Sequence, residues 1–168
     1  MAITAFSRAT ATQYKLVLNQ IPIPISAGNI HDMDDLKLNI FNVTLPSVTL
    51  DQAQMDWQGK HVYLHHGGVT FDPLNINFIV DGQFKNWRIL FTWLTNIANN
   101  KDRATRPPDE YVTDGAIILL DNWNETVFTL AFRNIWIQNL GELQFSIRDG
   151  ETTIECSALF YYDRYEIG

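Results

Sequence analysis

The sequence predicts a mainly β protein: an antiparallel β-sandwich or partly closed barrel with one flanking α-helix. Most of the chain alternates apolar and polar residues, which is typical of strands that bury one face. Residues 83–98 differ, because their apolar residues recur at helical spacing. This helix lies among the strands without the strand–helix alternation of a parallel sheet. A length of 168 residues suits one domain, and we expect residues 1–168 to form it.

The first half of the chain is expected to be extended after an N-terminal segment, residues 1–12. Two prolines, Pro22 and Pro24, disturb the end of the first strand, since proline cannot donate to a ladder. Residues 47–60 indicate an extended polar arm outside regular structure, and Gly67-Gly68 is expected to end the strand that follows it. The predicted strands in this half are residues 13–25, 36–45, 61–66 and 74–80.

The helix and the second half follow from local signals. Asp81 is a suitable N-cap for the helix at 83–98, and Asn99-Asn100 supplies a C-terminal stop before a polar loop at 99–111. Asp149-Gly150 is typical of a tight hairpin turn. The predicted strands in this half are residues 113–121, 126–137, 142–148 and 152–163.

Composition and motifs argue against several classes of function. The net charge of −7 argues against tight nucleic-acid binding, and the chain lacks an apolar stretch long enough for membrane insertion. No nucleophile elbow or phosphate-binding loop is present, and Cys156 fits a small core residue on a strand. We therefore expect neither an enzyme nor a cofactor.

Two histidine-containing segments resemble metal sites in composition. His61 and His65 share a strand face but lie roughly 13 Å apart at about 3.3 Å per residue, and His66 points the other way. His31 lies beside acidic residues, at Asp32, Asp34 and Asp35, that lack the ligand order of a calcium loop. We expect no metal site.

Trp57 lies in the arm among polar neighbours. Two interpretations are open: it folds back onto its own domain, or it anchors the arm on a neighbouring copy, as exposed tryptophans do in interfaces. In the second case Leu50 and Met55 are the other apolar contacts that the arm offers.

The two predicted C-terminal strands share a polar face. Alternation places Leu143, Cys156 and Ala158 on the opposite, apolar face. The polar face is either simply solvated or lines a water-filled channel that DNA passes without sticking, because carboxylates repel phosphate. Its residues are Glu142, Gln144, Ser146, Arg148, Thr153, Glu155 and Ser157.

The chain resembles the tail tube proteins of contractile-tailed bacteriophages. The resemblance spans about residues 13–165 and includes the arm with Trp57 and the helix with Trp87 and Trp93. The other matching stretches are Val43-Thr44-Leu45-Pro46-Ser47, residues 70–78, residues 135–143 and Ala158-Leu159-Phe160-Tyr161-Tyr162-Asp163.

The resemblance implies a structural virion protein that forms six-fold rings, stacked into a tube whose lumen conducts DNA. It implies that strands 36–45, 58–66, 142–148 and 152–160 form the inner sheet, and that the arm contacts the adjacent ring or a neighbouring subunit. The helix and the loop at 99–111 would face the sheath. The implied lumen residues are Glu142, Gln144, Ser146, Thr153, Glu155 and Ser157.

Partners and location follow from the same resemblance. The partners are further copies, the tail sheath, and baseplate and tail terminator proteins, with DNA passing unbound. The protein would reside in the virion tail, and in the host cytoplasm before assembly. The alternatives are a tube-initiating or junction ring at the baseplate, and a non-viral β-sandwich binding module.

Overall fold

Nine β-strands and one α-helix are found in the computed structural model, which describes residues 14–18, 39–98, 111–120, 123, 125–145 and 153–168. In chain order they are β1 (Tyr14–Leu18), β2 (Asn39–Thr44), β3 (Val48–Trp57), β4 (Lys60–Phe71), β5 (Leu74–Ile79), α1 (Lys85–Ala98), β6 (Thr113–Leu120), β7 (Thr126–Leu140), β8 (Glu155–Tyr161) and β9 (Arg164–Ile167).

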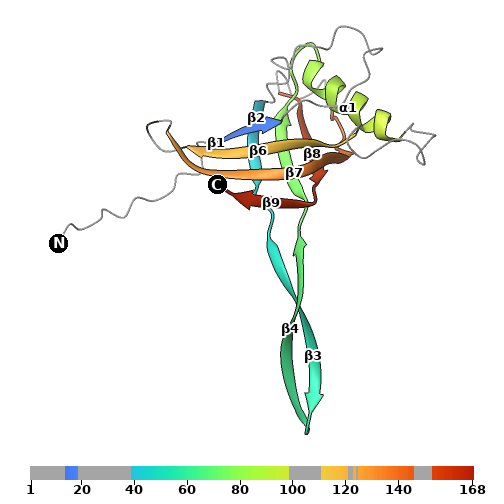
Figure 1. The fold of residues 1–168 in the computed structure, drawn as a ribbon. Helices are drawn as coiled ribbons and strands as arrows, with labels where there is room; N and C mark the ends of the chain where they lie inside the picture. Colours follow the sequence, from blue (N-terminus) through green and yellow to red (C-terminus); the bar gives the residue numbers. More distant parts are fainter. Residues whose placement is uncertain (1–13, 19–38, 99–110, 121–122, 124, 146–152) are drawn as a thin grey trace, which may run out of the picture.

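Seven of these strands form one antiparallel sheet in the order β1-β6-β7-β8-β5-β2, with β9 paired to β7. β7 serves both halves of the sheet, since its first part pairs with β6 and β9 and residues 136–140 pair with β8. β1 and β2, the first and last strands in this order, also make contact: the Tyr14 hydroxyl of β1 donates to the Ile40 carbonyl of β2 over 3.3 Å. The predicted class, a sandwich or partly closed barrel with one helix, is confirmed (Figure 1).

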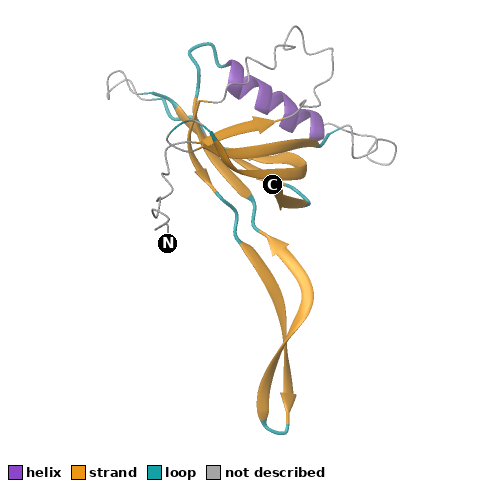
Figure 2. Cartoon of the chain, turned by 60° about the vertical axis from the view of Figure 1, so that its left-hand side comes forward, coloured by secondary structure: helices purple, strands orange, loops and turns teal. Residues whose placement is uncertain are grey.

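The core lies between the sheet and α1, which crosses one face of it (Figure 2). Leu74, Ile76 and Phe78 of β5 are fully buried, as their alternation predicts. From the helix, Ile89, Leu90 and Trp93 are buried against them. Burial of this apolar surface is the main force that holds the helix on the sheet.

The predicted helix is confirmed and begins at Lys85. The carboxylate of Asp81 accepts the backbone N–H groups of Gln83 at 2.8 Å and Lys85 at 3.0 Å, as a capping residue does. Asn86 donates from Nδ2 to the Ile79 carbonyl at 2.9 Å, which ties the first turn to β5. The predicted stop at Asn99-Asn100 lies outside the described residues.

The prediction for residues 47–66 is wrong in its details. The arm is not an isolated extended segment: β3 pairs with β4 along its whole length, from Val48 with Phe71 to Trp57 with Lys60. Gly67-Gly68 does not end the strand but lies in a bulge between two paired segments, with Gly67 at a φ of 76°. Glycine tolerates this conformation. The Gly-Gly pair, which usually ends a strand, therefore forms a bulge inside β4.

The C-terminal strands also differ from their prediction. β7 extends to Leu140, and residues 142–145 are not a strand. The strand predicted at 152–163 corresponds to β8, which ends at Tyr161, and β9 follows it at Arg164–Ile167 without having been predicted. Leu143 packs half-buried against the core, and its two neighbours are exposed. The alternation of apolar and polar residues in this segment therefore reflects contact with the core and not a strand. Residues 146–148 and the turn predicted at Asp149-Gly150 lie outside the described residues.

Candidate assembly surfaces

The hairpin of β3 and β4 projects from the domain as a separate two-stranded sheet (Figure 1). All ten residues of β3 are exposed, and the Trp57 side chain at the tip keeps 60% of its surface exposed. Trp57 therefore does not fold back onto its own domain. Gln58 and Gly59, with φ of 49° and 75°, make the tight turn that reverses the chain beside it.

The base of the hairpin is held firmly against the domain. The Phe71 ring meets the Tyr165 ring edge-on with centroids 5.2 Å apart, and the Tyr162 hydroxyl donates to the Asp72 carbonyl at 2.7 Å. The Ser47 hydroxyl also donates to the Asp72 carboxylate. These contacts fix the direction in which the hairpin leaves the domain.

Exposed apolar residues of the hairpin occupy one ribbon face near the base and the other near the tip. Register pairs Leu50 with Val69 at the base, and Met55 with Val62 at the tip. The two pairs lie on opposite faces, because Met55 is five positions after Leu50 and successive side chains in a strand point to opposite faces. We call these residues the apolar contacts of the hairpin; they are Val48, Leu50, Val69, Met55, Trp57, Val62 and Leu64.

The hairpin ribbon is twisted. The strands of the hairpin exchange sides about midway along its length (Figures 1 and 2). The ribbon face opposite Trp57 near the tip carries polar residues and the exposed ring of Tyr63. His61 Nδ1 lies 2.7 Å from Gln54 Nε2 and 2.5 Å from Asp56 Oδ1 on this face.

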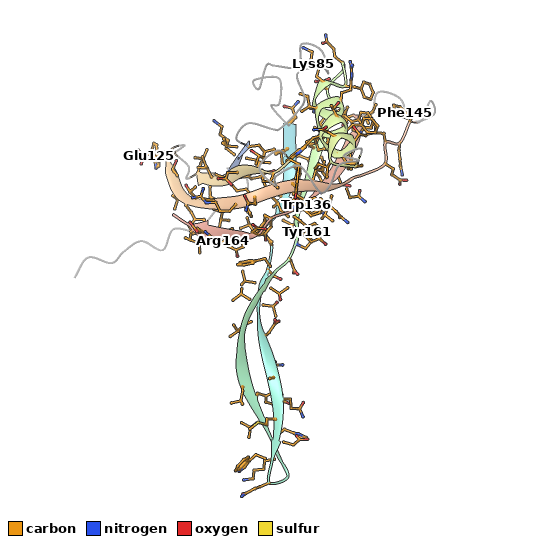
Figure 3. All side chains as sticks on the ribbon, turned by 45° about the vertical axis from the view of Figure 1, so that its right-hand side comes forward. Lys85, Glu125, Trp136, Phe145, Tyr161 and Arg164 are labelled. Carbon is orange, nitrogen blue, oxygen red and sulfur yellow. The ribbon has the colours of Figure 1, made fainter. Side chains whose placement is uncertain are left out.

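A second surface is the outer face of the part of the sheet that β2, β5, β8 and the end of β7 form. Neighbouring strands place polar residues in rows across it: Asn42, Asn77 and Ser157 in one row, then Thr44 and Asn75. We call this the polar sheet face; its residues are Asn39, Asn42, Thr44, Asn75, Asn77, Asn139, Glu155 and Ser157. At its end nearest the hairpin, the rings of Trp136 and Tyr161 stack 5.6 Å apart (Figure 3).

The predicted lumen residues are partly brought together here. Glu155 and Ser157 are exposed on β8, opposite buried Cys156 and Ala158, so the predicted facing of this strand is confirmed. Thr153 is exposed just before β8. After β7, Gln144 donates to Glu142 over 3.3 Å, and both are exposed but not in a strand. Ser146 and Arg148 lie outside the described residues.

The strands assigned to an inner sheet need correction. Residues 60–66 belong to the hairpin, and β5 with the end of β7 takes their place beside β2 and β8. The asparagines of β2, β5 and β7 were therefore missed as surface candidates. The signal was available, because Asn75 and Asn77 alternate with the buried Leu74, Ile76 and Phe78.

Groups able to do chemistry are sparse in the described part of the chain. Cys156 is buried, burial raises the pKa of its thiol, and its Sγ lies 3.5 Å from the Gly141 carbonyl oxygen. Within the described residues no three metal-ligating side chains cluster. Nor does any helix there have the length and apolar character needed to span a membrane.

Comparison with known proteins identifies the family. The sequence model described as phage tail tube protein matches residues 8–168 of this chain. The chain belongs to the phage tail tube protein family. It is therefore a structural protein of phage or phage-like tails, and not an enzyme.

Two curated relatives of this chain are a tail tube terminator protein and a tail tube protein. The tail tube terminator protein of Enterobacteria phage T4 is 32% identical over 107 residues, which cover 60% of this chain and 59% of the terminator. The chain thus matches less than two thirds of that protein's length. The tail tube protein of Serratia phage KSP90 is 27% identical over 146 residues, covering 84% of this chain and 81% of that protein.

Solved structures show the same fold. The PVC sheath/tube terminator of an extracellular contractile injection system has a TM-score of 0.69 at 14% identity, covering 98% of this chain and 99% of that one. A chain of the PVC sheath–tube complex has a TM-score of 0.63 at 14% identity, covering 98% and 93%. Hcp1 from Escherichia coli EAEC 042 has a TM-score of 0.55 at 10% identity, covering 94% and 91%.

Proposed function

We propose that this protein is the tube subunit of a contractile tail, assembling with copies of itself into stacked six-membered rings. The observation that carries this is the hairpin, which holds exposed apolar side chains away from its own domain. Large apolar side chains gathered on one exposed element mark an interaction site. The hairpin is the arm through which one copy contacts a copy in the neighbouring ring, with Leu50, Met55 and Trp57 as its anchors.

Ring stacking is a heterologous contact that does not close, so it produces a filament. Within a ring, the six copies join their sheets side by side, which removes exposed strand edges. The net charge of −7 keeps unassembled subunits apart in the host cytoplasm until a baseplate template starts the tube.

The polar sheet face lines the lumen in this proposal. Among its described residues, Glu155 is the one charged side chain, and the others that the rows bring together are mainly amides and hydroxyls. A wall without clustered cations cannot release counterions from DNA, so it offers little affinity for phosphate. DNA therefore passes without being held. The remaining partners are the sheath outside the tube, the baseplate below it and the terminator above it.

A second candidate is the tube terminator, favoured by the identity to the phage T4 terminator. A baseplate initiator ring is a third possibility within the same fold. Length of assembly distinguishes them, because a tube subunit adds ring after ring whereas a terminator or initiator stops at one ring.

Negative-stain electron microscopy of the purified protein over a concentration series tests the proposal. We expect long hollow tubes of stacked rings. A variant in which a short Gly-Ser turn replaces residues 49–70 keeps the domain and should form no tubes. Isolated rings at every concentration would favour the terminator or initiator, and monomers throughout would support a binding module instead.

A further inference from the structure

The hairpin joins the domain through two short links, residues 45–47 and 72–73, where the strand ladder is interrupted. The ladder of β2 and β5 ends before these links, and the ladder of β3 and β4 begins after them. Each link contains a proline, Pro46 or Pro73, which has no N–H to donate to a ladder. The two links therefore form a joint at the base of the hairpin, and strand pairing alone does not set the angle of this joint.

The length of the hairpin makes the angle at its base important. β3 has ten residues, so at about 3.3 Å per residue the tip lies roughly 30 Å from the joint. A tilt of about 5° at the joint would move Trp57 by roughly 3 Å, close to the rise of one strand residue. A gap of about 1 Å already loses much of the attraction between packed groups. An arm that binds near its tip therefore needs a base with a fixed direction.

Asp72, in the second link, is held from two sides. Its N–H donates to the Ser47 carbonyl at 3.1 Å, and its carboxylate accepts the Ser47 hydroxyl, so the two links are tied to each other. The Asp72 carbonyl accepts the Tyr162 hydroxyl at 2.7 Å, and Tyr162 lies between β8 and β9 in the chain. Among the described residues, this is the side-chain hydrogen bond that ties the linked pair to the rest of the domain.

Aromatic rings hold the Tyr162 side chain in place. Its ring packs edge-on against Phe132 of β7 with centroids 4.9 Å apart, and lies 6.1 Å from Phe71, the last residue of β4. Phe71 also meets Tyr165 of β9, which begins near the point where the hairpin leaves the sheet (Figure 1). Phe132 is fully buried, so the Tyr162 ring rests on the close-packed core. Burial raises the pKa of Tyr162, so its hydroxyl stays protonated and remains a donor.

We propose that Tyr162 is a positioning residue for assembly: its hydrogen bond to Asp72 sets the direction of the hairpin, so that the apolar contacts of the hairpin meet a second copy of the chain. The inference rests on the proposed function for the second copy. Stacked rings repeat one heterologous contact, so every copy must present its arm at the same angle. A direction that is set before contact also reduces the ordering cost of association. Tyr162 thus acts through the hairpin and lies outside the contact itself.

Spin-label distances in the unassembled chain test the joint directly. Lys15→Cys on β1 and Lys60→Cys near the hairpin tip, both at exposed positions, carry the labels in a Cys156→Ala background. With Tyr162 present, pulsed electron paramagnetic resonance should give one narrow distance distribution. Tyr162→Phe removes only the hydroxyl and should widen the distribution by about twofold or more, because the arm then moves about its joint.

Two further variants complete the comparison. Tyr165→Phe removes a hydroxyl from the same ring cluster but not the hydrogen bond to Asp72, so it should leave the distribution unchanged. Ser47→Ala unties the two links while every aromatic ring stays in place, so it should widen the distribution as Tyr162→Phe does.

Assembly of the same variants, without labels, tests the consequence. Tyr162→Phe should lower tube yield by about fivefold or more, because arms without a set direction pay a larger ordering cost. Its melting temperature should fall by less than about 4 °C, since one hydrogen bond at a partly exposed group contributes little to folding. Tyr165→Phe should form tubes like the wild type.

The outcomes separate this inference from the proposed function. An unchanged distance distribution in Tyr162→Phe and Ser47→Ala overturns the joint. A widened distribution with unchanged tube yield overturns the role of Tyr162 in assembly. If the wild type forms no tubes while the Tyr162→Phe distribution widens, the tube proposal fails and the joint stands.

Discussion

Asp114 on β6 and Arg133 on β7 form an ion pair at the point where β7 leaves one half of the sheet for the other. Arg133 Nη1 lies 2.8 Å from Asp114 Oδ2. The other carboxylate oxygen accepts the backbone N–H of Asn134 at 3.1 Å, and Asn134 has a φ of 54°. One carboxylate thus stabilises a backbone conformation that is uncommon for residues other than glycine.

Acid should weaken this bend. The pKa of Asp114 lies below its usual range, chiefly because of the Asn134 N–H and also because of Arg133. A carboxylate with a lowered folded pKa stabilises the protein above its unfolded pKa, and this contribution is lost as the pH falls through the folded pKa. Asp114→Asn should therefore lower the free energy of unfolding by about 1 kcal/mol near neutral pH, because the pair is partly exposed.

Urea unfolding of the wild type and of Asp114→Asn measures this difference. The gap should be constant between about pH 5 and pH 8 and should close below about pH 4. Glu155→Gln, at an exposed carboxylate on β8, serves as the control. A gap that stays constant down to about pH 2 would show that the charge of Asp114 is not what matters.

Trp57 and Tyr63 form a matched pair on the hairpin, because their exposed fractions are 60% and 63% and they occupy opposite faces near the tip. Trp57→Ala should change the free energy of unfolding by less than about 0.5 kcal/mol, since the side chain is exposed in the monomer. Tube yield, measured by sedimentation and microscopy, should fall at least about tenfold. Tyr63→Ala should reduce it much less. Equal losses for the two variants would contradict a one-sided hairpin contact.

The variant Glu155→Lys tests whether the polar sheet face lines the lumen. Glu155→Lys should leave tubes intact, because the residue is exposed on the polar sheet face and contributes little to folding. A ring of six added lysines would attract phosphate and slow DNA ejection, measured by dye release from particles carrying the variant. Glu166→Lys on β9 is the control, and an unchanged ejection rate with Glu155→Lys would place this residue outside the lumen.

Trp93 and Trp87 should respond differently to loss of the indole nitrogen. Trp93 is fully buried and donates from Nε1 to the Tyr111 carbonyl at 3.0 Å, so Trp93→Phe should cost about 2–3 kcal/mol. The buried Trp87 Nε1 has no hydrogen-bond acceptor in the described part of the chain. Trp87→Phe removes that unpaired donor, so its cost should stay within about 1 kcal/mol. Thermal unfolding compares the two, and equal losses would mean that the Trp93 hydrogen bond contributes little.

Much of the fold could be predicted because burial of one strand or helix face is a local pattern. The helix with its Asp81 cap, the alternation of β5 and the facing of β8 all follow from periods of two or 3.6 residues. The hairpin could not be predicted this way. β3 is exposed along its whole length, so the sheet core imposes no alternation on it, and its pairing with β4 across a glycine bulge overrides the usual meaning of Gly67-Gly68.

From the sequence alone follow the mainly β class, the single helix, the isolated tryptophan in a polar segment, and the polar character of one face of β8. Only the tertiary structure decided that Trp57 stands at the tip of a twisted ribbon, and that asparagines from three strands share a face with Glu155 and Ser157. Both outcomes depend on register between segments far apart in the chain. Register arises from long-range pairing, so a local pattern of residues does not contain it.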